Sequence, residues 1–436
     1  MRDEESRRPP GPPGHWLRGN SPAYEADRIG FLRRCHREYG DVFSFDEQTV
    51  CVVDPDLAHE VLTRTGSGFL TELPPFDARP DLDGAAAQAH AWMSARRTVW
   101  PGLNHTAAAA HDGRIVQILD TIVGPAAGHE IDVLAMTHRF TAEAVTDYCF
   151  GPGPSEIPGL LRENADAVER FAAGSHRLPA FIPRRRDRRF FRVHRRTVDT
   201  LTRIVGARRA EGAGTPPADL LDQLLDADPR LPDRTVVSTL RGVLLGGHGV
   251  PAAALASIVR ELALRPGLAA ELRDEAGGTA GGCAPPPARL RLAEAVVREV
   301  LRLYPPAWLM TRTARTAQPL ARWSLRPGDE VLLPAYLIHR DPRWWRRPDD
   351  FDPGRWLAGR PARGTTYLPF GAGPRVCLGA ALAMRQLSLA TSRLAQRYTI
   401  TSSNATSAVP KPGGRLAPDG LRARLQPVVP HATATS

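Results

Sequence analysis

Phe370-Gly-Ala-Gly-Pro-Arg-Val-Cys-Leu-Gly379 is the most informative stretch of this chain, because it places one cysteine in a tight glycine turn ahead of an apolar helix. Gly371 and Gly373 permit backbone angles that residues with a Cβ rarely adopt, so the chain can fold sharply beneath a flat group. Cys377 then comes at the start of a helix predicted over 378–397, where free amides and the helix dipole favour the thiolate over the thiol. The pattern predicts that Cys377 coordinates a metal through its thiolate.

Two neighbours of this cysteine suit a flat, anionic cofactor. Gly379 allows the backbone to approach such a group closely, and Arg375 can pair with an anionic group on its rim. If the metal is haem iron, a single thiolate ligand favours cleavage of the O–O bond. The alternative is a buried structural cysteine after a glycine-rich turn, and the motifs described below argue against it.

The stretch resembles the haem-binding loop of the cytochrome P450 family, Phe-Gly-x-Gly-x-Arg-x-Cys-x-Gly, with every fixed position filled. Ala383 matches the small residue that the family usually places four positions after the last glycine. The resemblance implies that haem b (iron protoporphyrin IX) is the cofactor and that Cys377 is its iron ligand and a catalytic residue. It also implies that the following residues contact the haem: Phe370, Gly371, Arg375, Cys377, Gly379 and Ala383.

The same resemblance implies the P450 fold, which is mainly α with a small β lobe and forms a single domain. The composition agrees with one large globular unit, since 42% of the 436 residues are hydrophobic and no Ser/Gly linker divides the chain. We expect a flexible Pro-rich N-terminus over 1–22, the P450 domain over 23–428 and a flexible C-terminal tail over 429–436. Helices are predicted over 24–39, 55–65, 290–303, 378–397 and most of 84–276, strands over 41–45, 49–53, 398–402, 421–425 and within 311–334, and turn-rich segments over 66–84 and 344–374.

The net charge of +10 comes almost wholly from arginine, because Lys411 is the single lysine among 57 lysine and arginine residues. Such a skew is typical of a GC-rich coding bias. The basic runs Arg184–Arg189 and Arg195–Arg196 lack a recognition motif or a regular pattern of aromatic residues, which argues against nucleic-acid binding. A basic surface that docks an acidic electron-transfer protein is the better interpretation.

Cysteine usage and hydropathy indicate where the protein works. The five cysteines are scattered, odd in number and without C-x-x-C spacing, which argues against a disulfide framework or a zinc site and favours a reducing cytoplasm. No apolar run approaches the roughly 20 residues of a membrane span, and the start of the chain has no signal-peptide pattern. We therefore expect a soluble, cytoplasmic protein without a membrane span.

A second motif, Glu299-Val-Leu-Arg302, places an acid and a base on one face of a predicted helix. A solvent-exposed pair would be the ordinary interpretation of this spacing alone. The segment Pro353-Gly-Arg355-Trp356 resembles the family's Pro-Glu-Arg-Phe segment. The resemblance implies a structural network of Glu299, Arg302 and Arg355 that holds Cys377 in place under the iron.

Further motifs follow in the family's order. Trp92-Met-Ser-Ala-Arg96 matches the W-x-x-x-R of the helix that binds the haem propionates, and its spacing puts both side chains on one face. Arg312 stands where relatives have a third propionate partner, and His339-Arg-Asp-Pro342 matches four residues common among relatives. The resemblance therefore assigns Trp92, Arg96 and Arg312 to cofactor binding.

The long helix expected over the distal haem face departs from the family pattern. Relatives carry Ala/Gly-Gly-x-Asp/Glu-Thr-Thr/Ser there, and the acid and the alcohol organise the water that delivers protons. Here the block is Gly246-Gly-His-Gly-Val-Pro251, with Gly249 in place of the acid and Val250 in place of the alcohol. Pro251 also leaves the Gly247 carbonyl without its usual amide, so we predict a widened or kinked helix whose carbonyl can hold water. Gly247 and Val250 are therefore candidate catalytic positions.

Three interpretations of this departure remain open. A substrate hydroxyl or amine could organise the proton-delivering water, and this is the interpretation that we favour. Peroxide could be used directly, although relatives that do so usually carry an arginine in this helix and none stands at 246–251. The enzyme could also catalyse a rearrangement or nitrogen-oxide chemistry. His248 is either a substitute proton donor or, more simply, a histidine packed between helices.

The resemblance implies a bacterial-type haem-thiolate monooxygenase that inserts one oxygen atom of O₂ into a hydrophobic secondary metabolite. It would receive electrons from NAD(P)H through an external reductase and a ferredoxin or flavodoxin, and a carrier protein could present the substrate. A protein that only binds haem and a hydrophobic ligand is the alternative from another class. A mobile lid is expected over 171–191. The expected pocket residues are Phe69, Phe76, Gly246, Gly247, Val250, Ala307, Trp308 and Leu309.

Overall fold

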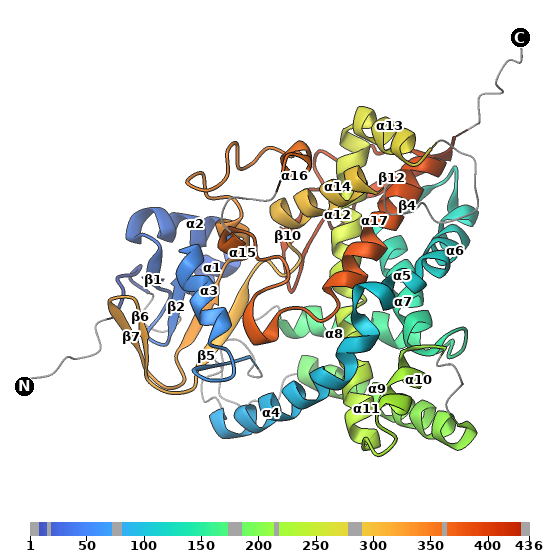
Figure 1. The fold of residues 1–436 in the computed structure, drawn as a ribbon. Helices are drawn as coiled ribbons and strands as arrows, with labels where there is room; N and C mark the ends of the chain where they lie inside the picture. Colours follow the sequence, from blue (N-terminus) through green and yellow to red (C-terminus); the bar gives the residue numbers. More distant parts are fainter. Residues whose placement is uncertain are drawn as a thin grey trace, which may run out of the picture.

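A β-rich lobe lies beside a larger helical part in the computed structural model, which describes residues 8–14, 19–71, 81–172, 185–212, 218–277, 290–359 and 364–428 (Figure 1). The main sheet of the lobe has the strand order β1-β2-β8-β5-β3, in which only β2 and β8 are parallel neighbours. Its strands are β1 (Val42–Ser44), β2 (Thr49–Val52), β3 (Phe69–Leu70), β5 (Met310–Ala314) and β8 (Glu330–Leu333), next to the hairpin of β6 (Gln318–Leu320) and β7 (Trp323–Leu325).

Helices form most of the rest of the described chain. They are α1 (Ser21–Ala26), α2 (Arg28–Tyr39), α3 (Pro55–Thr63), α4 (Leu82–Val99), α5 (His105–Ala110), α6 (Asp112–Val123), α7 (Val133–Phe150), α8 (Ile157–Ala172), α9 (Arg185–Glu211), α10 (Leu220–Ala227), α11 (Asp233–Gly246), α12 (Gly249–Leu264), α13 (Pro266–Glu275), α14 (Arg291–Leu303), α15 (Ala335–Ile338), α16 (Gly354–Leu357) and α17 (Ala380–Arg397). Two small sheets complete the fold: β4 (Glu130–Asp132) with β12 (Arg422–Pro427) and β9 (Tyr398–Thr401), and β10 (Lys411–Pro412) with β11 (Leu416–Ala417). The predicted mainly α architecture with a small β lobe is confirmed.

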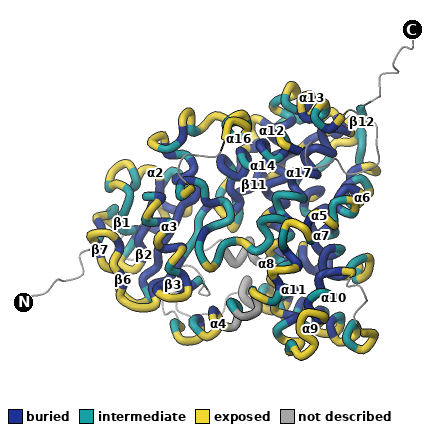
Figure 2. Tube along the Cα trace, in the orientation of Figure 1, coloured by how far each residue is buried: buried dark blue, intermediate teal, exposed yellow. Residues whose placement is uncertain are grey.

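The core of the helical part is built by α12, α14 and α17, which Figure 2 shows as largely buried. On α14 the apolar side chains recur at helical spacing and all are buried: Ala293, Val296, Val297, Val300 and Leu301. Every residue of α12 from Pro251 to Leu262 is also buried. This packing holds α12 and α17 in fixed positions, and these two helices carry the distal and the cysteine-bearing segments of the site.

The stretch Asp233–Leu264, which contains α11 and α12, is long and apolar enough to cross a bilayer by composition. The expectation that no apolar run approaches that length is therefore wrong. In the structure, 67% of its most apolar window is buried inside the protein. Its apolar side chains serve the packing of the core.

Several predicted boundaries differ from the structure. The helix predicted over 24–39 is divided into α1 and α2, because Asp27 accepts a hydrogen bond from the Gly30 amide and caps the second helix. Part of the N-terminal segment that we expected to be flexible is held in place, since the Ser44 amide donates to the Pro10 carbonyl at 2.8 Å. The predicted late strands form β9 and β12, which pair in antiparallel fashion.

Candidate functional site

The glycine turn before α17 is closed by its own backbone. The Cys377 amide donates to the Phe370 carbonyl at 2.9 Å, and both Gly371 and Gly373 have a φ of +70°. A Cβ on Gly373 would also lie 2.5 Å from the Leu62 carbonyl oxygen of α3. The turn therefore needs glycine at these positions, as predicted from the sequence. The helix itself starts at Ala380 rather than at residue 378, so Cys377 lies just ahead of it.

The Cys377 side chain is exposed, whereas the other described cysteines, Cys35, Cys51 and Cys149, are buried. Protein atoms packed around the thiol still raise its pKa, and a hydrogen bond from the Gly379 amide and the charge of Arg96 act in the opposite direction. The amide at the start of the helix therefore favours the thiolate in the direction predicted from the sequence, while desolvation is the larger effect on the pKa of the free thiol. A bound metal cation supplies the charge that makes a coordinating thiol ionise.

Trp92 and two arginines form a cationic cluster beside this cysteine. The Arg375 guanidinium lies 4.0 Å from the centre of the Trp92 ring, and that of Arg96 lies 5.3 Å from it. Arg96 also donates to the Val376 carbonyl at 2.7 Å, although 280 positions separate the two residues. Desolvation lowers the pKa of Arg375 to about 10. The structure thus brings together three residues that were predicted from the sequence to contact the haem.

Arg312 on β5 adds a further buried guanidinium. It donates to the Thr65 hydroxyl at 2.8 Å and to the Thr311 carbonyl at 2.7 Å, and both of these acceptors are neutral. Desolvation lowers the pKa of Arg312 to about 10. A buried cation whose contacts are neutral is stabilised when an anion binds next to it.

These residues fit a thiolate-ligated haem. The cysteine is exposed, and Arg375, two residues before it, and Arg312 are desolvated cations of the kind that pair with carboxylates. A Cβ on Gly379, whose φ is negative, would meet no described protein atom within 4 Å, so the protein itself does not require glycine there. The open space beside Cys377 leaves room for a flat group. Ala383 lies one turn further along α17, where its amide donates to the Gly379 carbonyl at 2.8 Å.

The predicted network around Glu299 is formed, and the side chains of Glu299 and Arg302 in it are fully buried. Its carboxylate accepts two hydrogen bonds from Arg302, at 2.8 and 2.9 Å, and one from Arg355 at 3.0 Å. The indole of Trp356 donates to the same carboxylate at 2.9 Å. Arg302 donates in addition to the carbonyl oxygens of His339, Pro348 and Asp350. The network therefore ties α14 to the segment that leads to the cysteine turn.

His339 extends this network toward the cysteine turn. Its Nε2 accepts a hydrogen bond from the Leu368 amide at 2.8 Å, and its Nδ1 lies 3.3 Å from the Arg302 carbonyl oxygen. Burial, with the nearby charge of Arg302, lowers the pKa of His339 to about 3. The imidazole is therefore neutral and can act as donor and acceptor at once.

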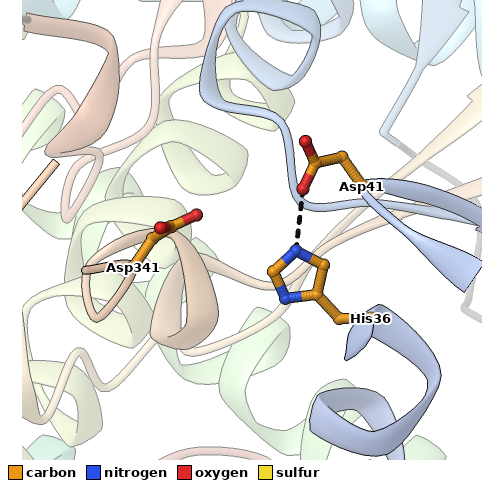
Figure 3. A group of neighbouring side chains, drawn as sticks. All are labelled: His36, Asp41 and Asp341. Carbon is orange, nitrogen blue, oxygen red and sulfur yellow. Dashed lines mark hydrogen bonds and ion pairs between the residues drawn. The ribbon is translucent and has the colours of Figure 1, made fainter. Parts of the chain in front are cut away.

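Asp341 of the same motif joins a group with His36 and Asp41, whose ligating atoms all lie within 4.8 Å of one another (Figure 3). His36 Nε2 lies 2.7 Å from Asp41 Oδ1. Arg343 donates to Asp41 at 2.7 and 2.8 Å and also to Asp341 at 2.9 Å, so both carboxylates are already paired with a cation. The group is an ion-pair network that fastens the β lobe to the segment after α15.

The distal helix is interrupted between α11 and α12. α11 ends at Gly246 and α12 begins at Gly249, while Gly247 and His248 form a turn. Pro251 cannot donate to the Gly247 carbonyl, and this lack of one hydrogen bond agrees with the predicted distortion. Gly247 packs tightly on α7, because a Cβ there would lie 2.6 Å from the Val145 side chain. Val250 is 39% exposed and faces open space.

His248 packs behind this break against α7. Its Nε2 lies 3.1 Å from Nδ1 of His138, and the ring centres are 4.8 Å apart. Burial, the neighbouring imidazole and the charge of Arg415 lower the pKa of His248 to about 3, and burial lowers that of His138 to about 4. A neutral imidazole held between two helices agrees with the packing interpretation of His248 rather than with a proton donor.

The other predicted pocket residues differ in how deeply they are buried. Ala307 and Gly246 are exposed and Leu309 is half-buried, whereas Phe69 is fully buried beside β5. Trp308 is also buried, and its indole donates to the Gly413 carbonyl at 3.1 Å. Phe76 and most of the lid expected over 171–191 lie outside the described residues.

The hairpin of β10 and β11 was not predicted as part of the site. It is attached to a predicted pocket segment by the hydrogen bond from the Leu416 amide to the Pro306 carbonyl at 3.1 Å. Arg415 extends from this hairpin to the helix break, where a Cβ on Gly249 would lie 2.6 Å from its guanidinium carbon. The Pro-x-Pro-Gly-Gly run at 410–414 is a turn signal that could have indicated the hairpin.

Comparisons with known proteins agree with this geometry. The family model for cytochrome P450 matches residues 9–419. The chain is 33% identical to cyclooctatin synthase of Streptomyces melanosporofaciens over 307 residues, which are 68% of this chain and 67% of that protein. It is 26% identical to cyclooctat-9-en-7-ol 5-monooxygenase of the same organism over 323 residues, 70% of each protein.

Among solved structures, the haem domain of cytochrome P450DA has a TM-score of 0.81 at 21% identity, and the match covers 98% of both chains. A mutant of that domain has a TM-score of 0.80 at 20% identity. At this identity the likeness shows the fold, and the family model covers nearly the whole sequence. The chain is a member of the cytochrome P450 family of haem-thiolate oxidoreductases.

Proposed function

We propose that this P450 is a monooxygenase that inserts one oxygen atom of O₂ into a hydrophobic substrate, and that a polar group of the substrate assists proton delivery. The interruption of the distal helix next to Gly249 and Val250 carries this proposal. Neither residue has a side chain that can donate or accept a hydrogen bond. The group that orients water at this position therefore has to come from elsewhere.

Haem b, held by the Cys377 thiolate, would supply the activation of O₂. Trp92, Arg96, Arg375 and Arg312 would bind its carboxylates through charge-assisted hydrogen bonds. The buried network of Glu299 keeps the cysteine turn in a fixed position relative to α14. The role of these residues is to hold the reactive atoms in one geometry.

The helix break offers a place for water. The Gly247 carbonyl lacks the amide that residue 251 would normally provide, so it can accept a hydrogen bond from a water molecule. A hydroxyl or amine of the substrate can donate to or accept from the same water and hold a proton there. Val250 adds an apolar wall next to it, which suits a hydrophobic ligand.

The names of two relatives support a substrate of this kind. One is a monooxygenase for cyclooctat-9-en-7-ol, an unsaturated alcohol, and thus for a hydrocarbon skeleton with one hydroxyl. The other is named for the synthesis of cyclooctatin. We extend this class to the present enzyme as a hydrophobic secondary metabolite with an oxygen function. An external ferredoxin or flavodoxin with its NAD(P)H reductase would deliver the electrons to a soluble, cytoplasmic enzyme.

Reconstitution with a ferredoxin and its reductase tests the proposal. We would search for ligands by the shift of the haem absorption band and then measure NAD(P)H-dependent oxidation of each ligand, with peroxide as the parallel oxidant. Incorporation of ¹⁸O from O₂ into a ligand that carries a hydroxyl supports the proposal. Oxidation with peroxide but not with the reductase system, or rearrangement without oxygen incorporation, contradicts it.

A further inference from the structure

The first half of α9 presents a basic face to solvent. Both arginine runs of the sequence, 184–189 and 195–196, fall on this helix or at its start. Arg189, Arg192 and Arg195 recur at intervals of three residues, so they lie along one side of the helix, and each of them is exposed. The stretch 189–198 contains no acidic residue. These three arginines form the basic face of α9.

The described part of the protein does not neutralise this face. None of its three arginines forms a hydrogen bond or an ion pair with a described residue. The arginines that follow on the helix differ, because Arg196 pairs with Glu163 at 2.7 Å and Arg203 pairs with Glu156. Asp199 is the first acid of α9 beyond the basic face. The positive charge of the face is therefore available to an external partner.

Phe191 places an apolar side chain beside the basic face. It is 58% exposed, more than any other large hydrophobic residue that the structure describes. The apolar side of α9 is complete without it, since Val193, Leu201 and Val205 are buried in the helical part. A single exposed apolar residue is common on protein surfaces, but a phenylalanine between arginines suits a partner with both anionic and apolar parts.

Contacts on the inner side of α9 fix the direction in which the basic face points. Asn164 of α8 donates to the Thr197 hydroxyl at 2.8 Å. Arg241 of α11 donates to His194 Nδ1 at 2.7 Å. Because α8 and α11 cover the inner side of the helix, the basic face is turned outward. It lies at the end of the helical part that is remote from α2 of the β lobe (Figure 1).

We infer that the basic face docks the enzyme on an anionic lipid surface, with Phe191 inserted among the head groups. Guanidinium groups pair well with lipid phosphates, and an aromatic residue beside basic ones is typical of helices that bind the membrane interface. The choice of lipid over an acidic protein rests on the proposed function, because a hydrophobic substrate partitions into membranes. The substrate named for one relative, cyclooctat-9-en-7-ol, is an alcohol and has no carboxyl group by which a carrier protein could hold it.

Flotation of the haem-loaded enzyme with vesicles of phosphatidylcholine, with and without phosphatidylglycerol, tests the inference. We expect binding to the vesicles that contain phosphatidylglycerol and none to the neutral ones. High salt should weaken the binding, because it screens the attraction between arginines and phosphates. The resting enzyme is used without reductase, and the carbon monoxide spectrum of the reduced protein verifies that each variant holds thiolate-ligated haem.

Two charge variants separate the basic face from the general positive charge of the protein. The α9 variant changes the three arginines of the basic face to Gln and should bind about a hundredfold more weakly, since each arginine near an anionic surface contributes a factor of about five. The α2 variant, Arg33→Gln with Arg34→Gln and Arg37→Gln, removes the same charge from exposed positions of another helix. It should change the binding by no more than about twofold.

A second pair of variants tests the insertion of the aromatic ring. Phe191→Ser should weaken binding about fivefold at low and at high salt, because the ring loses its apolar burial. Trp100→Ser is the control at another exposed aromatic residue, 50% exposed, and should leave the binding unchanged. Equal losses in the two variants would contradict the insertion of Phe191.

Three results would overturn docking on lipid. These are no binding of the wild type to anionic vesicles at low salt, an equal loss in the α9 and α2 variants, and a weaker affinity of the α9 variant for a ferredoxin with unchanged vesicle binding. The last result would assign the face to an acidic protein. A failure of NAD(P)H-dependent turnover would reject the proposed function and leave vesicle binding measurable. Normal turnover without vesicle binding would reject only the docking of α9.

Discussion

Gly373 meets the backbone of Leu62 so closely that a Cβ at position 373 would lie 2.5 Å from the Leu62 carbonyl oxygen and 2.6 Å from the Thr63 Cα. This contact joins the cysteine turn to α3 in the β lobe, far away in the sequence. Gly371 has the same φ of +70°, but its nearest neighbour for a Cβ is the Met310 sulfur at 3.7 Å. A side chain at position 371 would therefore meet backbone strain alone, whereas one at position 373 would meet both strain and a clash with the neighbouring backbone.

We predict that Gly373→Ala is more damaging than Gly371→Ala. The first substitution combines left-handed strain with a backbone clash and should reduce the free energy of unfolding by about 2–4 kcal/mol. The second adds strain alone and should cost about 1–2 kcal/mol. Urea unfolding followed by circular dichroism measures both, and the carbon monoxide difference spectrum reports haem content. Equal costs for the two variants would contradict the packing argument.

The Glu299 network predicts a large difference between two glutamates of α14. Glu299→Gln removes the buried negative charge that Arg302 and Arg355 share. It should lower the free energy of unfolding by about 3–5 kcal/mol, because the two cations lose their counter-ion. Glu294→Gln on the same helix removes a half-exposed ion pair with Arg298 at 3.8 Å. It should lower the free energy of unfolding by no more than about 1 kcal/mol. Both values come from urea unfolding of the haem-loaded protein. A small effect of Glu299→Gln would mean that the network adds little to stability.

Gly247 is predicted to be required for the packing of the distal helix on α7. A Cβ at 247 would lie 2.6 Å from Val145 Cγ2, so Gly247→Ala should destabilise the protein by about 1–3 kcal/mol through overpacking. Val145→Ala removes the clashing methyl groups. The double variant should therefore be less destabilised than the sum of the two single variants, as a double-mutant cycle measures. Additive costs would show that the strain arises from the helix backbone instead.

The paired histidines behind the break predict an acid-sensitive fold. Their pKa values are about 3 for His248 and about 4 for His138, below the ordinary 6.5, so protons bind to the unfolded chain first as the pH falls. Their contribution to stability is complete above about pH 6.5 and decreases toward pH 4. His248→Gln should reduce the slope of unfolding free energy against pH by about 1.4 kcal/mol per pH unit in this range. His105→Gln, at an exposed position, is the control and should leave the slope unchanged.

The elements that the sequence predicted well are those with a local signal. The positive φ of Gly371 and Gly373 follows from glycine in a turn, and the pairing of Glu299 with Arg302 follows from helical spacing. The boundary at Asp27 was missed because a single capping residue divides an otherwise continuous helical pattern.

The contacts that were missed join segments far apart in the chain. His138 and His248 are 110 positions apart, and no periodicity relates them. Arg415 reaches Gly249 from a hairpin whose strands have two residues each, too short for an alternating pattern. Glycine at position 249 was visible in the sequence, but the arginine that fills the space beside it depends on tertiary packing.

Restoring the usual acid and alcohol at the distal helix should therefore require a change at Arg415. In Gly249→Glu with Val250→Thr, the new side chain would displace the Arg415 guanidinium, whose Cζ lies 2.6 Å from the Cβ position at 249, and its carboxylate would then pair with that neighbouring cation. A carboxylate held in this way has a lowered pKa and is a poor proton donor. We expect the double variant to gain little turnover of substrates that lack a hydroxyl.

Adding Arg415→Gln frees the glutamate, so the triple variant should oxidise such substrates about tenfold faster than Arg415→Gln alone, at the low end of what a general acid contributes. The rate of product formation under reductase-driven turnover measures this, and a double variant as fast as the triple variant would show that Arg415 does not control the acid.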